Sequence, residues 1–178
     1  GQVSKIIVAV PERSIGGSFK DTNLTGNGFH SDWKISPEYN LCVPGGETSK
    51  VTAFGKFLDS KDTILLCTHS TLRFAFDKYG ASKFNNCLVA VDEFHHVSAN
   101  YESKLGELIR MLMDSTNAHI LAMTGSYFRG DGIPVLMPDD EAKFYKVTYN
   151  YYEQLNGYTY LNSLGIGFHF YHGKYMDA

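Results

Sequence analysis

The chain has 178 residues, of which 43% are hydrophobic and 14% aromatic, and its formal net charge is −3. This length suits about one domain with a buried core, and the composition excludes a disordered chain. A net negative charge gives no sign of a nucleic-acid partner, although such binding depends on local basic groups rather than on the total.

Four short runs are apolar at every position, which predicts strands buried on both faces. In chain order they are Ile6–Val10, Ile64–Cys67, Leu88–Val91 and Ile120–Met123. Apolar residues spaced by three and four predict helices between them. The predicted helices are Ser49–Leu58, capped by Thr48 or Ser49, then Thr71–Lys78, and Asn100–Asp114, capped by Asn100. Strands that alternate with helices favour an α/β domain whose mainly parallel sheet is covered by helices on both sides.

Two regions depart from this alternation. Residues 21–37 are rich in Gly, Asn, Asp and Ser, which predicts a loop. After Pro138, alternating apolar residues predict strands at Lys146–Tyr152 and Ile166–His172. We therefore divide the chain into a domain over residues 1–138 and a C-terminal extension over residues 139–178.

Polar side chains follow each predicted strand of the domain. Ligands of open parallel sheets bind outside the carboxyl ends of the strands, so these segments are candidates for a common site. They are Pro11-Glu12-Arg13, Thr68-His69-Ser70-Thr71, Asp92-Glu93-Phe94-His95-His96 and Thr124-Gly125-Ser126.

The adjacent carboxylates Asp92 and Glu93 suit nucleotide hydrolysis. One carboxylate can orient Mg²⁺ through water, and the other can deprotonate an attacking water molecule. A structural interpretation also exists, because acidic residues at a helix start interact favourably with the helix dipole.

Taken together, these segments resemble the motifs of superfamily-two helicases and translocases, in the order of that family. Asp92-Glu93-Phe94-His95 resembles motif II, and Val10–Arg13 (VPER) resembles motif Ia. Thr68–Leu72 (THSTL) resembles motif Ib, and Thr124–Gly132 (TGSYFRGDG) resembles motif III as found in restriction-enzyme motor subunits and repair helicases. The resemblance covers residues 5 to about 135 and implies a RecA-like (P-loop NTPase) three-layer domain.

The resemblance implies a role for each matching residue. Asp92 would hold Mg²⁺ through water, Glu93 would be the catalytic base, and His95 would sense the γ-phosphate of ATP. Coupling of hydrolysis to movement would fall to Thr124, Gly125, Ser126 and Arg129. Nucleic acid, either DNA or RNA, would contact Arg13, Thr68, His69 and Ser70, and we expect Arg13 and Thr68 on one exposed face. A second RecA-like lobe would be a further partner.

The chain departs from the family in one respect, because it has no GxxxxGK[ST] phosphate loop. The glycine pair Gly45-Gly46 is followed by Glu47, a carboxylate where phosphate would need a cation. In the resembled family the phosphate loop precedes motif Ia, so we expect it before Gly1, with the domain truncated before its first strand. Isolated, the chain would then be inactive, and Ile120–Met123 would lie at a sheet edge open to self-association or to Ile166–His172.

Two other functions remain open at this stage. A non-catalytic, degenerate helicase-like module could bind nucleic acid or dock a partner. A metal-dependent hydrolase could use His69, Asp92, Glu93, His95 and His96 with zinc or manganese.

The sequence also bears on the cellular compartment. Its three cysteines include no CxxC pair, which indicates free thiols in a reducing environment. No apolar run approaches the ~20 residues of a membrane span, and no leader precedes Lys5. We expect a cytoplasmic protein without membrane contact.

Overall fold

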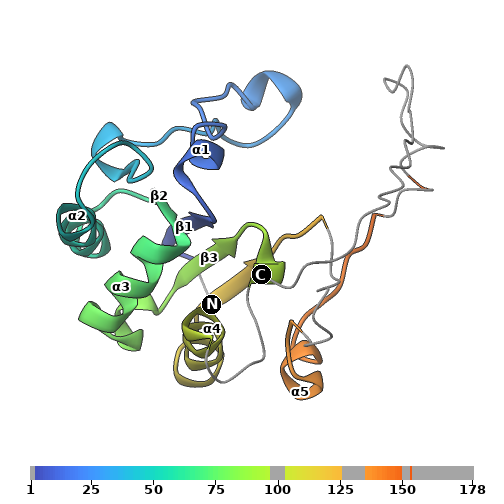
Figure 1. The fold of residues 1–178 in the computed structure, drawn as a ribbon. Helices are drawn as coiled ribbons and strands as arrows, with labels where there is room; N and C mark the ends of the chain where they lie inside the picture. The colour runs from blue at the N-terminus through green and yellow to red at the C-terminus, as the bar shows by residue number, and fades with distance from the viewer. Residues whose placement is uncertain (1–2, 97–102, 126–134, 150–152, 154–178) are drawn as a thin grey trace, which may run out of the picture. The chain divides into compact units, whose positions relative to one another are not determined.

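The computed structural model describes residues 3–96, 103–125, 135–149 and 153 (Figure 1). The chain divides into two compact units, Gly1–Lys143 and Phe144–Ala178. In the second unit, residues 145–149 are exposed and form no strand, so the predicted strand Lys146–Tyr152 is wrong over residues 146–149. The rest of that strand and all of Ile166–His172 lie outside the described residues.

The strands and helices of the first unit follow the predicted order. The strands are β1 (Lys5–Val10), β2 (Ile64–Thr68), β3 (Cys87–Val91) and β4 (His119–Ala122). The helices are α1 (Arg13–Gly16), α2 (Glu47–Asp59), α3 (His69–Tyr79), α4 (Lys104–Ser115) and α5 (Pro138–Glu141). Short 3-10 helices lie at Thr25–Asn27, Pro37–Tyr39, Ala81–Phe84 and Phe94–His96. The four predicted strands and three predicted helices of residues 1–138 are thus confirmed.

Two helices have other N-terminal caps than predicted. The cap of α2 is Gly46, in extended conformation and without a side-chain hydrogen bond, because the helix begins two residues earlier than expected. The cap of α4 is Ser103, whose hydroxyl accepts the N–H of Gly106 at 3.2 Å. Its predicted cap, Asn100, lies outside the described residues.

The four strands form one parallel sheet in the order β2-β1-β3-β4. At the centre of the sheet, Ile7 of β1 lies opposite Leu65 of β2 on one side and Val89 of β3 on the other. Since every pairing is parallel, the carboxyl ends of all four strands meet at one edge of the sheet. The predicted α/β class with a mainly parallel sheet is confirmed.

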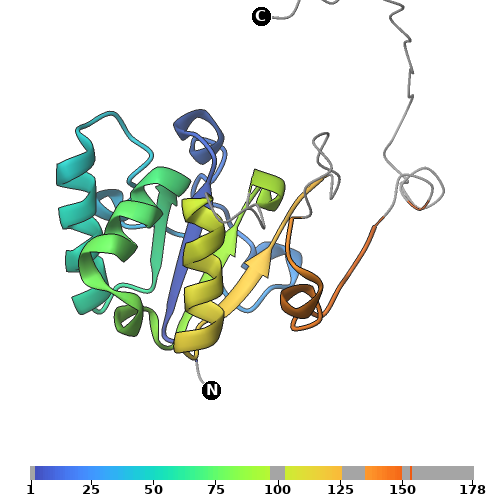
Figure 2. The ribbon, with the colours of Figure 1, turned by 60° about the horizontal axis from the view of Figure 1, so that its bottom comes forward.

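Helices cover one face of the sheet. The helices α2, α3 and α4 lie side by side there (Figure 2). Aromatic rings fill the space between them, with Phe84 6.0 Å from Phe54 and 5.5 Å from Phe76 between ring centroids. Phe54, Phe57 and Phe84 are fully buried. This layer is the larger apolar core of the unit.

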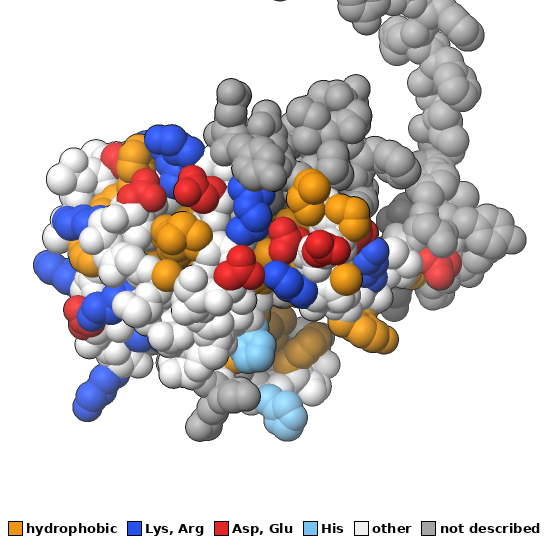
Figure 3. Space-filling model, turned by 90° about the horizontal axis from the view of Figure 1, so that it is seen from below, with side chains coloured by type: hydrophobic (Ala, Val, Ile, Leu, Met, Phe, Trp, Pro, Cys, Tyr) orange, Lys and Arg blue, Asp and Glu red, His pale blue; other side chains and the backbone are white. Residues whose placement is uncertain are grey.

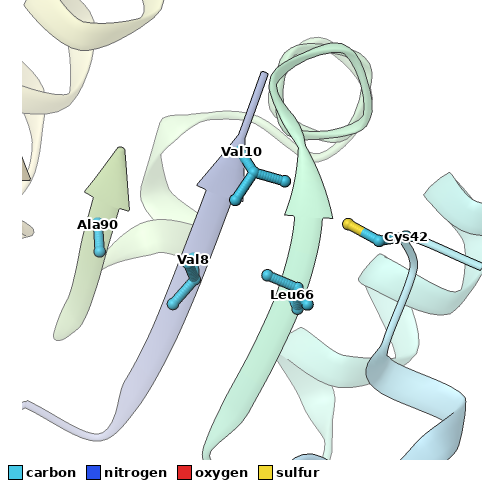
Figure 4. Packing of buried hydrophobic residues seen from close by; sticks show 5 residues of the cluster. All are labelled: Val8, Val10, Cys42, Leu66 and Ala90. Atoms are coloured by element: carbon cyan, nitrogen blue, oxygen red, sulfur yellow. The ribbon is translucent and has the colours of Figure 1, made fainter. Parts of the chain in front are cut away.

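A loop covers the opposite face, where helices were expected. Val8, Val10, Leu66 and Ala90 form a buried cluster with Cys42, which comes from outside the sheet (Figure 4). Partly buried side chains of the loop pack against this cluster, among them Phe19, Trp33 and Ile35. Glycine and short polar residues disfavour helix and favour turns, which explains why residues 21–37 form a loop. The predicted loop is confirmed, and the third layer of the domain is made from it.

The strand β4 lies at one end of the sheet order. It pairs with β3, and among the described residues no strand pairs with its other side. The side chain of Leu121 on this strand is 46% exposed. The predicted open edge is therefore observed over the described part of the chain, while the segment proposed to cover it lies outside that part. None of the described helices is long and apolar enough to cross a membrane.

Candidate functional site

The polar segments identified in the sequence meet at the carboxyl edge of the sheet. Arg13 begins α1 just after β1, and His69 begins α3 directly after β2. Asp92 follows β3 immediately, and Thr124 lies two residues beyond the end of β4. The parallel sheet therefore brings together residues that are up to 111 positions apart in the sequence.

A tight turn carries Asp92 and Glu93 out of β3. The N–H of Asp92 donates to the carbonyl of Ala9 at 2.9 Å, which extends the pairing of β3 with β1. Its Oδ1 accepts the N–H of Glu93 at 3.0 Å. Glu93 has a φ of +48°, a left-handed conformation that costs free energy for a residue other than glycine. Strained backbone of this kind is concentrated at functional sites.

Packing of the next residue holds this turn in place. Phe94 is 1% exposed, and its N–H donates to the carbonyl of Met123 at 2.8 Å. The N–H of Met123 in turn donates to the carbonyl of Val91 at 3.0 Å. The end of β3 and the end of β4 are thereby joined into one rigid edge.

His95 links the carboxylate of Glu93 to the end of β4. Its Nδ1 lies 3.1 Å from Oε2 of Glu93 and 3.0 Å from Oγ1 of Thr124. The ring of His96 packs on that of His95 at 4.5 Å between centroids and 31° between planes. A change at Glu93 can therefore reach Thr124 through a single imidazole ring.

His69 lies against the backbone of Asp92 rather than on an exposed face. Its Nε2 is 2.9 Å from the carbonyl oxygen of Asp92, and burial lowers the pKa of the imidazole below its usual value. A neutral ring with the proton on Nε2 donates to that carbonyl. The contact joins the end of β2 to the turn that carries the two carboxylates, which is a positioning role that sequence reasoning did not identify.

The residues expected to contact nucleic acid separate into two groups. Arg13 and Ser70 are exposed, and Nη2 of Arg13 donates to the carbonyl of Gly45 at 3.3 Å. Thr68 is only 7% exposed, and its Oγ1 accepts the N–H of Thr71 at 3.2 Å to cap α3. The expectation that Thr68 lies with Arg13 on an exposed face is wrong, because a cap of this kind points its oxygen into the helix end.

Glu47 and Lys50, at the start of α2, are two residues whose placement sequence reasoning missed. The carboxylate of Glu47 accepts a short hydrogen bond from Oγ1 of Thr71, so it is turned toward α3. Lys50 is 4% exposed, and its Nζ has no hydrogen-bond partner among the described residues. A Cβ on Gly45 would lie 3.8 Å from Cε of Lys50, which places the lysine behind the glycine pair. No pattern in the sequence distinguishes this lysine from a surface lysine.

The donor set at the carboxyl edge bears on metal binding. Among the described residues, no group of three or more His, Cys, Asp and Glu side chains could hold a metal ion. The hypothesis of a zinc or manganese hydrolase therefore has no support in this part of the chain. A single, partly exposed carboxylate at Asp92 fits Mg²⁺, which keeps several of its waters and takes one or two protein oxygens. Of the remaining predicted site residues, Gly125 is exposed, while Ser126 and Arg129 lie outside the described residues.

The parallel sheet and the polar residues at its carboxyl edge define the class of protein as an α/β domain with a candidate site at one edge of the sheet. A comparison with known proteins finds a relative that is named as a helicase. Over 174 residues, or 98% of its length, the chain is 60% identical to a Bacillus subtilis (strain 168) protein named "Putative ATP-dependent helicase YeeB". The chain spans 29% of the length of that relative. This similarity agrees with the predicted resemblance to helicases.

A solved structure is also similar to part of the chain. The helicase domain of Pyrococcus furiosus Hef matches 72% of this chain and 25% of its own, with a TM-score of 0.48 and 15% identity. No protein-family model matches the sequence.

Proposed function

We propose that this chain supplies the water-activating and Mg²⁺-orienting part of an ATP-driven nucleic-acid motor. The observation that carries the proposal is the connection of Glu93 through His95 to Thr124, beside Asp92, at one edge of a parallel sheet. A carboxylate that must take a proton from water needs a fixed position and a neighbour that responds to its charge. The relative's name, which includes the words ATP-dependent helicase, supports the same reading.

Each residue has a defined task in this proposal. Asp92 would hold Mg²⁺, which would supply positive charge to offset the phosphates of ATP. Glu93 accepts the proton of the attacking water, and His95 holds Glu93 before hydrolysis. Once Glu93 is protonated, its hydrogen bond with Nδ1 of His95 changes, and Thr124 receives that change because its hydroxyl contacts the same nitrogen. Gly125, Ser126 and Arg129 would continue the coupling toward a second RecA-like lobe.

Nucleic acid, DNA or RNA, would be held near Arg13 and Ser70. Arg13 is exposed, and its Nη2 donates to the carbonyl of Gly45, so its guanidinium lies at the surface where a phosphate can reach it. Phosphate contacts of this kind are independent of base sequence and weaken with salt. The side on which α3 and α4 lie is less suitable, because its visible acidic and basic side chains are interspersed (Figure 3).

The decisive experiment is Glu93→Gln in the full-length protein. The amide keeps the shape of the side chain but accepts no proton, so nucleic-acid-stimulated ATP hydrolysis should be abolished while nucleotide binding remains. Glu12→Gln is the matched control, because Glu12 is an exposed carboxylate at the end of the neighbouring strand β1. Hydrolysis by Glu93→Gln within a few-fold of the native rate would remove Glu93 from its role and favour a non-catalytic docking module.

A second measurement concerns the isolated chain. Because the sequence contains no GxxxxGK[ST] loop, residues 1–178 alone should bind ATP weakly or not at all. Calorimetry with and without Mg²⁺ measures this directly. A micromolar, Mg²⁺-dependent affinity would mean that another part of this chain cradles the phosphates.

A further inference from the structure

A cavity of about 350 Å³ lies between the end of α1 and the loop that covers the second face of the sheet. Gly16, Gly17, Phe19, Lys20, Asn40 and Val43 are among the residues that line it. Its volume falls in the range of sites for small organic ligands. None of the tasks proposed above uses this cavity.

The inner wall of the cavity is apolar and supported from behind. Phe19 and Ile35 line the cavity and also pack against the buried cluster of Val8, Val10 and Leu66. The ring of Trp33 lies 6.1 Å from that of Phe19 at an angle of 50°, and holds it from the side. At the rim, the exposed Gly17 has no side chain that would keep a flat ligand away. Phe19 therefore offers a supported aromatic ring for stacking.

The polar groups of the rim can meet the edge of such a ligand. Oδ1 of Asn40 accepts the N–H of Cys42 at 3.2 Å, whereas its NH₂ group makes no hydrogen bond within the described residues. Lys20 and Asp21 both line the cavity, so one positive and one negative charge lie at its rim. This balance suits an uncharged ring with polar edges better than a phosphate group.

We propose that the cavity binds one unpaired base of the nucleic-acid strand, stacked on Phe19 with its polar edge toward Asn40 and Lys20. The inference rests on the proposed function, because Arg13, which would hold a phosphate of the strand, starts the helix whose last residue lines the cavity. Flat rings of any base can stack on an aromatic side chain, so the contact tolerates many sequences. The cavity adds a base contact to a surface otherwise expected to bind phosphates alone.

The test compares two strands and two variants of the full-length protein. Val43→Phe adds an aromatic ring inside the cavity at a residue that is 49% exposed, so the core is left intact. Val3→Phe is the matched control, because Val3 is 39% exposed at the opposite end of β1. The probes are a single-stranded oligodeoxynucleotide and an oligomer of equal length in which abasic residues replace the nucleotides. Binding is measured by fluorescence anisotropy at one salt concentration.

The expected result separates a base contact from phosphate contacts. Val43→Phe should weaken binding of the normal strand by on the order of tenfold and leave the abasic strand unchanged. Val3→Phe should change neither. Asn40→Asp, which keeps the acceptor for Cys42 but removes the NH₂ donors, should weaken the normal strand more than the abasic strand, because its added negative charge repels the phosphates of both.

Three outcomes would overturn the inference. If Val43→Phe binds the normal strand as the native protein does, the cavity is not used. If both strands are weakened equally by Val43→Phe, the contact is not with a base. If the native protein binds neither strand, the proposed function fails, and the base site with it. The first two outcomes leave the proposed function standing.

Discussion

Two layers cover the sheet, the helices on one face and the loop on the other, and they differ in how their side chains pack against the strands. On the helical side, long apolar side chains such as Phe54 and Phe57 are fully buried between α2, α3 and the sheet. On the loop side, Phe19 and Trp33 are only partly buried, and short hydrogen bonds within the loop replace helical backbone bonding. The helical layer is therefore the more rigidly packed of the two, while the loop leaves room for a cavity beside the site.

The largest effect is expected for Phe54→Ala on the helical side. The side chain has no exposed area and contacts the ring of Phe84, so its removal leaves a cavity that helices cannot close. We expect a loss of about 3–5 kcal/mol in the free energy of unfolding. Urea denaturation followed by far-UV circular dichroism measures it. A loss below about 1 kcal/mol would show that the helical layer is not the more rigidly packed of the two.

A smaller effect is expected for Trp33→Ala on the loop side. The indole is only partly buried, and its Nε1 is buried without a hydrogen-bond partner among the described residues. We expect a loss of about 2 kcal/mol, roughly half the cost of removing a fully buried aromatic side chain. Trp33→Phe should cost less, because it also removes the unpartnered donor. If Trp33→Ala lowers the free energy of unfolding as much as Phe54→Ala does, the loop contributes to stability as strongly as the helical layer.

The single tryptophan allows the stabilities of the loop side and the helical side to be compared within one protein. Because Trp33 is the only tryptophan, its fluorescence reports on the loop side, while circular dichroism at 222 nm mainly reports on helices. If the loop side is less stable than the helical side, the fluorescence change should begin at a lower urea concentration than the circular dichroism change. The difference should widen in Asn23→Ala, which removes the acceptor of the N–H of Gly26 within the loop. Coincident transitions for both signals would mean that the two covers unfold together.

The close approach of α2 and α3 offers a second test on the helical side. A Cβ on Gly55 would collide with the ring end of Tyr79, whose hydroxyl donates to the carbonyl of Val51 at 3.1 Å. Gly55→Ala should therefore destabilise by about 1 kcal/mol despite the better helix propensity of alanine. In a Tyr79→Ala background the same change should instead stabilise by about 0.5–1 kcal/mol. Additive effects in this double-mutant cycle would contradict the packing described.

The smallest effect is expected for Asp32 in the loop. Its Oδ1 accepts the N–H and the hydroxyl of Thr25, each at 2.9 Å, and these bonds lower the pKa of the carboxyl below its ordinary value of 3.8. Because the pKa is lower in the folded loop, the contribution of Asp32 is complete above about pH 4. It is lost as the pH falls through the lowered value.

Amide exchange provides the measurement for Asp32. Asp32→Ala should speed exchange of the Thr25 amide at neutral pH without shifting the urea midpoint of the whole domain. Asp77→Ala, at an exposed position of α3, is the control and should leave that amide unchanged. A shift of the global midpoint with Asp32→Ala would make the loop part of the cooperative core.

The sequence alone predicts much of the architecture. Continuous apolar runs specify strands that must be covered on both faces, and spacings of three and four specify helices with one buried side. The order of the strand-end segments was also readable, because side chains such as Asp92 and Thr124 follow directly after apolar runs. These features depend on neighbours in the chain, so the amino-acid order alone reveals them.

Which polar groups face the solvent depends on tertiary contacts. Thr68 and Thr71 look like surface residues in the sequence, yet both are buried because the end of β2 turns directly into α3. Lys50 is buried for a similar reason, since its helix position faces inward beneath Gly45. The cavity beside Phe19 depends on how the loop crosses the sheet. Contacts between residues distant in sequence set these outcomes, and no local pattern records such contacts.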